Sequence, residues 1–167
     1  MPQGNRVESR SHLGGTAAAE RQGVGRTTIA KMEPRYSNSY VERLVLERDR
    51  DRLYQLLSVL ARRAILPEEL WAFNRMMEWL GSTRSGVWQY YEGIPEDVFA
   101  RLRNWLLRVG WQELHARYTE GMAELSAGGN CAQLDRWLDE HDEDIVAALW
   151  HLVAPQIGWL KTTAGAG

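Results

Sequence analysis

Cysteine is nearly absent from this sequence, which holds Cys131 alone among its 167 residues. A single cysteine cannot form an intrachain disulfide, and nothing else in the sequence indicates an oxidising compartment. Long apolar stretches are also missing: the longest, residues 145–154, is interrupted by His151 and is too short to span a bilayer. The first residues contain no continuous apolar segment of the kind found in secretion signals. We therefore expect a cytoplasmic protein without membrane contact.

Residues in arrangements that suit catalysis or metal binding are scarce. His115, His141 and His151 share no i,i+4 spacing and have no cysteine pair beside them, so a zinc site is not expected. Residues 81–86 form neither a Gly-x-Ser-x-Gly elbow nor a Walker A loop. Cys131 lies beside an expected helix start, but no base accompanies it, and a packed small residue is the simpler interpretation. These absences predict a protein that is not an enzyme and holds no cofactor or metal.

The composition is that of a folded helical domain. Hydrophobic residues make up 44% of the chain and charged residues 25%, which is typical of globular proteins. No segment shows sustained alternation with β-branched residues, whereas apolar residues recur at helical spacing. The sequence therefore predicts an all-α fold, a compact bundle of about five to seven helices. We expect residues 37–161 to form one helical domain, residues 1–36 a disordered leader, and residues 162–167 a flexible C-terminus.

Local signals indicate where the helices begin and end. Ser39 with Glu42 fits a capping box at the start of the first helix. Pro67 and Pro95 suit first-turn positions, and acidic residues follow each of them. Gly110 fits the C-terminal cap of the helix that begins near Pro95.

A glycine followed closely by aromatic residues distinguishes the segment Gly86-Val87-Trp88-Gln89-Tyr90-Tyr91. The simpler interpretation is structural: Gly86 permits a tight turn, the aromatic side chains wedge a short helix into the core, and Gln89 hydrogen-bonds a loop backbone. The alternative is a ligand pocket formed by the aromatic rings, with Gln89 as the polar group that recognises the ligand. Such a pocket would make this a small-molecule-binding or catalytic helical domain.

This segment resembles the turn of a bacterial domain family of unknown function that is named after a DNA-mimic protein. That turn is Asn-Gly-Gly-Phe-x-Gln-aromatic-aromatic. Gly86 matches its second glycine, and an Ile-Gly-like pair that follows in the family is matched by Val109 and Gly110. Arg84 and Ser85 stand where the family has Asn-Gly. The matches to the phenylalanine, the glutamine and the two aromatics are Val87, Gln89, Tyr90 and Tyr91.

The resemblance covers roughly residues 66–153 and carries expectations about function. It implies a helical, non-catalytic domain that binds proteins. The DNA-mimic member implies an acidic surface that occupies a nucleic-acid-binding partner, and the family also makes a homodimer plausible. Function transfers less surely than fold between such relatives.

Acidic residues are concentrated near the C-terminus. Residues 111–167 carry three basic and nine acidic side chains, although the net charge of the whole chain is −2. One interpretation is local: Asp142 caps the last helix with two acids in its first turn, and Asp135 and Asp139 share a solvated face. The other is an acidic face that binds a basic protein partner. The six acids of this face are Asp135, Asp139, Glu140, Asp142, Glu143 and Asp144.

Arginines alternate with aspartates in residues 48–52, within an arginine-rich first helix. These arginines could contact phosphate, but the interleaved acids cancel their field, so a surface helix laced with salt bridges is the simpler interpretation. No recognition-helix or RNA-binding motif accompanies them, and direct nucleic-acid binding is therefore not the leading hypothesis. The leading hypothesis is that the protein is a non-catalytic interaction domain, which engages a basic or DNA-binding protein partner through the acidic face. Nucleic-acid binding and the aromatic pocket remain alternatives.

Overall fold

The helices of this protein follow one another with short connections. The computed structural model describes residues 35–165, and in this range it contains helices and no strand, which confirms the all-α prediction. None of these helices combines the length and apolarity needed to cross a membrane. The predicted leader falls almost entirely outside the described residues. The elements are α1 (Asn38–Leu46), α2 (Arg50–Leu60), α3 (Glu68–Gly81), η1 (Ser82–Arg84), α4 (Trp88–Gly93), α5 (Glu96–Arg108), α6 (Gln112–Ser126), α7 (Ala132–Val153), η2 (Ala154–Gln156) and α8 (Ile157–Gly165).

The start of the domain is capped two residues earlier than the sequence suggested. Ser37, not Ser39, is the N-cap of α1, because its extended backbone lets Ser37 Oγ accept a hydrogen bond from the amide of Tyr40 at 3.2 Å. The expected first helix is divided at Arg48, whose backbone is left-handed with φ of 52°. Asp49 then caps α2, with its carboxylate accepting from the amide of Arg52 at 3.1 Å.

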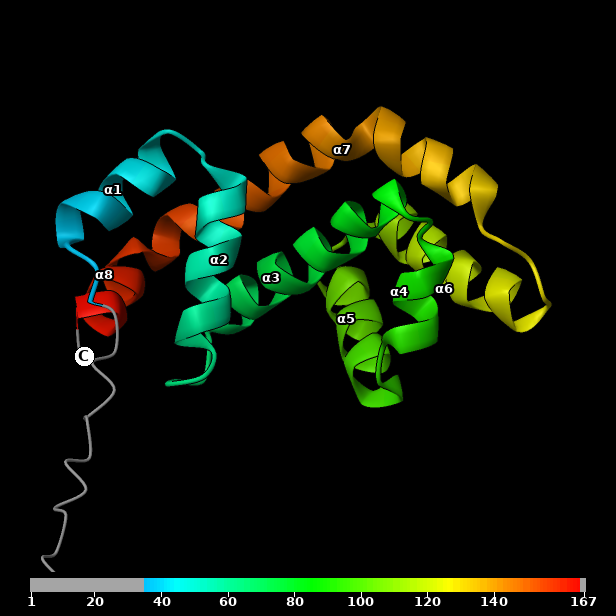
Figure 1. The fold of residues 1–167 in the computed structure, drawn as a ribbon, viewed down its shortest axis with the longest axis horizontal. Coiled ribbons are helices and arrows are strands. Elements are labelled where there is room, and N and C mark those ends of the chain that lie inside the picture. Colours follow the sequence, from blue (N-terminus) through cyan, green and yellow to red (C-terminus); the bar gives the residue numbers. More distant parts are fainter. Residues whose placement is uncertain (1–34, 166–167) are drawn as a thin grey trace, which may run out of the picture. The chain divides into compact units, whose positions relative to one another are not determined.

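The two ends of the described chain pack against each other. Figure 1 shows α1 and α8 side by side, and the amide of Tyr36 donates to the carbonyl of Ala164 at 3.1 Å. Lys161 and Glu42 add an ion pair between the same two helices. The prediction of a flexible C-terminus from residue 162 is therefore wrong for residues 162–165. Those residues are the last turn of α8, and the methyl group of Ala164 is buried.

Helix α3 supplies much of the core because nearly every face of it is covered. It packs against α2, α5 and α7, and its large apolar side chains Phe73, Met76 and Trp79 are fully buried. Trp105 of α5 and Tyr118 of α6 are buried as well. Gly110 closes α5 as expected: its φ is +80°, its amide bonds the carbonyl of Leu107, and the next amide bonds that of Leu106.

Helix α7 is continuous where the sequence suggested a break. Asp142 was expected to cap a separate last helix, but it lies in the middle of a 22-residue helix. No glycine or proline falls within this helix, and buried apolar residues lie both before and after the acidic run. The local interpretation of the acidic run is therefore wrong for Asp142 and the two acids after it. The buried apolar residues are Leu134, Leu138, Ile145, Val146, Leu149, Trp150 and Val153.

Candidate functional site

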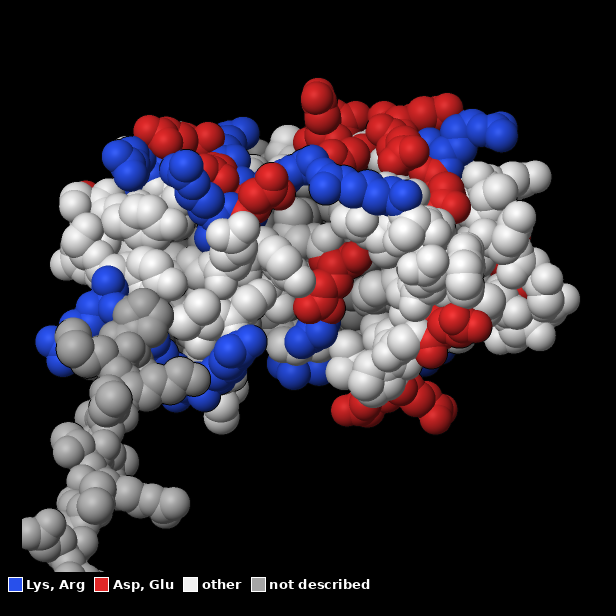
Figure 2. All heavy atoms as spheres, viewed as in Figure 1, with Lys and Arg blue, Asp and Glu red and all other residues white. Residues whose placement is uncertain are grey.

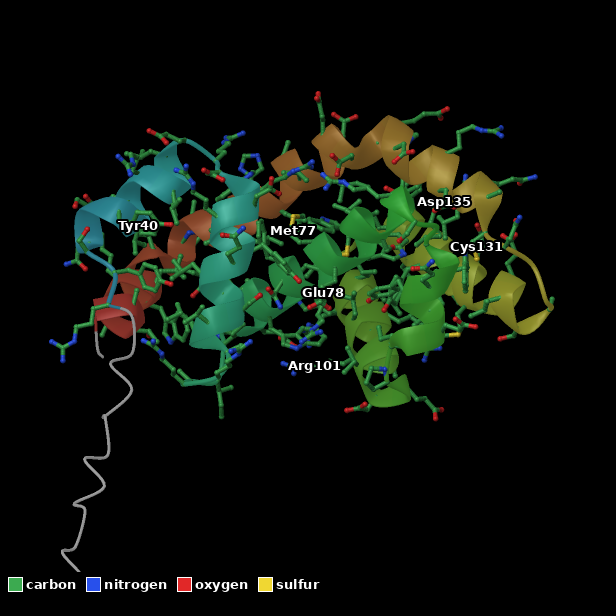
Figure 3. The ribbon with its side chains drawn as sticks, in the orientation of Figure 1. Tyr40, Met77, Glu78, Arg101, Cys131 and Asp135 are labelled. Carbon is green, nitrogen blue, oxygen red and sulfur yellow. The ribbon has the colours of Figure 1, made fainter. Side chains whose placement is uncertain are left out.

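The aromatic turn is tied directly to the acidic run. Gly86 has φ of +98°, a conformation that L side chains rarely adopt, and this lets the chain turn into α4. The amide of Val87 then points at α7, where Asp135 Oδ1 accepts its hydrogen bond at 2.7 Å. Figure 3 shows Asp135 on α7 beside the start of α4. One of the six predicted face residues thus anchors the turn instead of pointing freely into solvent.

We expect Asp135→Ala to lower the free energy of unfolding by about 1–2 kcal/mol, because the amide of Val87 loses its acceptor. Asp135→Asn keeps an acceptor oxygen and serves as the control.

Burial raises the pKa of Asp135, so the folded state holds its proton more tightly than the unfolded state does. The part of the stability that comes from this raised pKa is complete below the ordinary pKa of aspartate and is lost as pH rises through the raised value, whereas the acceptor oxygen for Val87 remains after ionisation. Urea unfolding should therefore show that the free energy of unfolding of the wild type falls, relative to that of Asp135→Asn, between acid and neutral pH. A constant difference would contradict this assignment.

The tyrosine side chains of the turn pack against the core and form hydrogen bonds there. Tyr91 is buried, and its hydroxyl accepts from Trp79 Nε1 at 2.9 Å and donates to the carbonyl of Tyr118 at 3.0 Å. The hydroxyls of Tyr90 and Tyr118 share a hydrogen bond of 2.9 Å. Burial raises the pKa of all three tyrosines well above the ordinary value, so they remain neutral hydrogen-bonding groups.

The structural interpretation of the turn is confirmed at Gln89, whose Nε2 donates to the carbonyl of Ser85 at 3.2 Å. The alternative pocket needs a cavity lined by the turn. Four hollows of residues 35–165 are lined by other residues, and Trp88, Gln89, Tyr90 and Tyr91 contribute to none of these four. The geometry therefore gives the ligand-pocket hypothesis no support at this turn.

Four of the six predicted acids form an exposed row on α7. Asp139, Glu140, Glu143 and Asp144 are exposed, and within residues 35–165 none of them makes an ion pair. Their spacing of three and four residues places them along one side of the helix. Figure 2 shows acidic side chains gathered over α7 along the top edge of the view. We call these four residues the α7 ridge.

Asp142 faces a different neighbour. It forms an ion pair with Arg50 at the start of α2, and this contact joins residues 92 positions apart. Arg50 Nε also lies 3.9 Å from Asp51 Oδ1, and Arg52 Nε lies 3.4 Å from Asp49 Oδ2. The sign-alternating segment is thus laced with ion pairs, as predicted. These pairs neutralise two of the arginines that the nucleic-acid hypothesis needed.

A shallow groove lies beside the α7 ridge, between the start of α6 and the middle of α7. Trp111 and Trp137 line it, Asp144 belongs both to this groove and to the ridge, and its volume is about 610 Å³. Trp137 stacks on His141 with their ring centroids 4.4 Å apart. The sequence could not separate core from surface tryptophans: Trp79 and Trp105 are buried, whereas Trp111 and Trp137 are half-exposed. We call this feature the tryptophan groove.

Cys131 is a packed residue, as predicted. Its thiol is buried and donates to the carbonyl of Gly121 at 3.4 Å, and burial raises the pKa of the thiol. Over residues 35–165, no three histidine, cysteine, aspartate or glutamate side chains gather in a way that could hold a metal ion.

Comparisons with family models, curated proteins and solved structures found no match to this chain. The resemblance to the DNA-mimic-protein family therefore rests on the turn motif and stays a prediction.

Proposed function

We propose that this protein is a non-catalytic interaction domain that binds a basic protein partner through the α7 ridge and the tryptophan groove. The observation that carries the proposal is their continuity. The α7 ridge holds four exposed carboxylates without ion-pair partners among the described residues, and one of them, Asp144, also lines the groove with its two half-exposed tryptophans. Tryptophan is enriched among the residues that dominate binding energy at protein interfaces. Charge complementarity at the rim raises the association rate and selects the partner.

The charge spacing supports a partner that normally contacts nucleic acid. The ridge spans six residues, a helical rise of about 8 Å. Duplex DNA carries about one negative charge per 1.7 Å along its axis. The four carboxylates therefore approach the linear charge density of DNA over this short distance. The resemblance to the DNA-mimic-protein family points to the same class of partner.

The test compares two variants with equal changes in charge. Asp139→Lys/Glu143→Lys reverses two ridge residues. Glu47→Lys/Glu92→Lys is the control and reverses two exposed acids, one directly after α1 and one on α4. The tagged full-length chain is used to capture partners at low and high salt, and captured proteins are identified by mass spectrometry. The association rate of each captured protein is then measured with the purified variants.

We expect a basic partner that is released by salt, and an association rate that falls about tenfold or more in the ridge variant because electrostatic steering is lost. The control variant should bind like the wild type. Equal rates in the two variants, or the absence of any salt-sensitive partner, would contradict the proposal. Concentration-dependent sedimentation of the wild type, abolished in the ridge variant, would identify a second copy of this chain as the occupant.

A further inference from the structure

A second hollow, of the opposite charge, lies away from the α7 ridge. Arg62 and Arg63, which follow α2, line it together with Arg75 of α3 and Arg101 of α5. Its volume is about 490 Å³, within the range of small-molecule sites. No aspartate or glutamate is among its lining residues in the described part of the chain. Figure 3 shows Arg101 between α5 and the end of α2. We call this hollow the arginine cleft.

The positive charge of the cleft is only partly compensated. Arg75 pairs with Glu78 at 2.6 Å, one turn further along α3. Arg101 makes no ion pair within residues 35–165, and its guanidinium lies 3.9 Å from the ring centre of Trp71, which also lines the cleft. A guanidinium that packs over an aromatic ring still has N–H groups available to another acceptor.

The floor of the cleft contains a buried polar group that lacks a partner. Asn74 on α3 is 4% exposed, and it lines the cleft. Its Oδ1 is buried and accepts no hydrogen bond. The neighbouring Arg75 Nε is also buried and donates none. Buried polar groups are almost always paired, so an unpaired acceptor and an unpaired donor on residues that line the same cleft indicate a group supplied from outside.

We propose that the arginine cleft binds a small phosphorylated compound whose hydroxyl or amino group donates to Asn74 Oδ1. Arg75 Nε donates to a phosphate oxygen, and Arg101, on a different helix, adds further N–H donors. A simple inorganic anion would satisfy the arginines but would leave Asn74 Oδ1 without a donor. Sugar phosphates and nucleotides carry both kinds of group. The proposal does not depend on the α7 ridge, which is a separate surface of opposite charge.

The test is isothermal titration of the full-length chain with AMP, glucose 6-phosphate and inorganic phosphate. The variants are Arg101→Gln and Asn74→Leu, and the control is Arg108→Gln. Arg108 is on the same helix as Arg101 but lies outside the cleft and pairs with Glu68. We expect one of the two organic phosphates to bind at a single site, more tightly than inorganic phosphate. Arg101→Gln should weaken binding at least about tenfold, as expected for a lost charged hydrogen bond, and Arg108→Gln should not.

Asn74→Leu should abolish the preference for the organic phosphate while raising the melting temperature, because it removes an unpaired buried acceptor. The side-chain amide resonances of Asn74 in the wild-type protein give a second measurement that needs no variant, and they should shift on binding. The proposal is overturned if no probe shifts these resonances at millimolar concentration. It is also overturned if Arg101→Gln and Arg108→Gln bind equally, or if a short oligonucleotide binds more tightly than AMP with an affinity that Asn74→Leu does not change.

Discussion

Gly121→Ala is expected to lower the free energy of unfolding by about 1–3 kcal/mol, the range measured for overpacked cores. A Cβ atom on Gly121 of α6 would lie 2.5 Å from both Cζ and the hydroxyl oxygen of Tyr91. The ring cannot easily move away, because hydrogen bonds to Trp79 and to the backbone of Tyr118 hold its hydroxyl in place. This clash outweighs the gain of about 1 kcal/mol that alanine normally brings to a helix interior.

Gly158→Ala is the matched control for this substitution. Gly158 lies in α8, and a Cβ atom there would meet nothing within 4 Å. We expect this variant to be as stable as the wild type or more stable by up to about 1 kcal/mol. Urea unfolding followed by circular dichroism measures both variants. Equal stability of the two would show that Tyr91 is not fixed as described.

Tyr91→Phe is expected to destabilise the fold by about 2–3 kcal/mol although it removes a single oxygen atom. The hydroxyl serves two buried groups, Trp79 Nε1 and the carbonyl of Tyr118. Phenylalanine fills the same space and leaves both groups unpaired. Each unpaired buried group costs about 1–3 kcal/mol, and relaxation of the neighbours recovers part of the sum.

Tyr90→Phe is the control for the second prediction. The hydroxyl of Tyr90 contacts the hydroxyl of Tyr118 at the edge of the same cluster, and Tyr90 is less buried than Tyr91. Its loss should cost about 1 kcal/mol. Denaturant unfolding gives both values. A larger loss for Tyr90→Phe than for Tyr91→Phe would mean that the cluster is organised around Tyr90 instead.

The sequence predicted those parts of the fold that depend on local chemistry. The helix starts at Pro67 and Pro95 are confirmed, because the fixed φ of proline suits a helix start, although each proline is the N-cap and not a residue of the first turn. Gly110 ends α5 because a left-handed residue lets two carbonyls of the last turn find donors. In both cases the decisive contacts lie within a few residues along the chain.

The sequence failed where distant contacts decide the outcome. An aspartate such as Asp142 has the same local pattern whether it caps a helix or lies within one, and its partner Arg50 is 92 residues away. Asp135 was grouped with the other acids, yet its bond to Val87 spans 48 residues. The arginine cleft was missed because its side chains come from three separate helical regions. A polar Asn74 between the apolar residues Phe73 and Met76 was its one local signal.

The contact between Tyr36 and Ala164 also has a mechanical consequence. Glu42 pairs with Lys161 further along, so α1 and α8 run in opposite directions from the point where the two ends meet. A force that pulls on both ends would therefore load one turn of this interface at a time and peel α1 away from α8. The remaining helices would bear the load only after these two had separated, which makes the junction of the ends the first element to yield under tension.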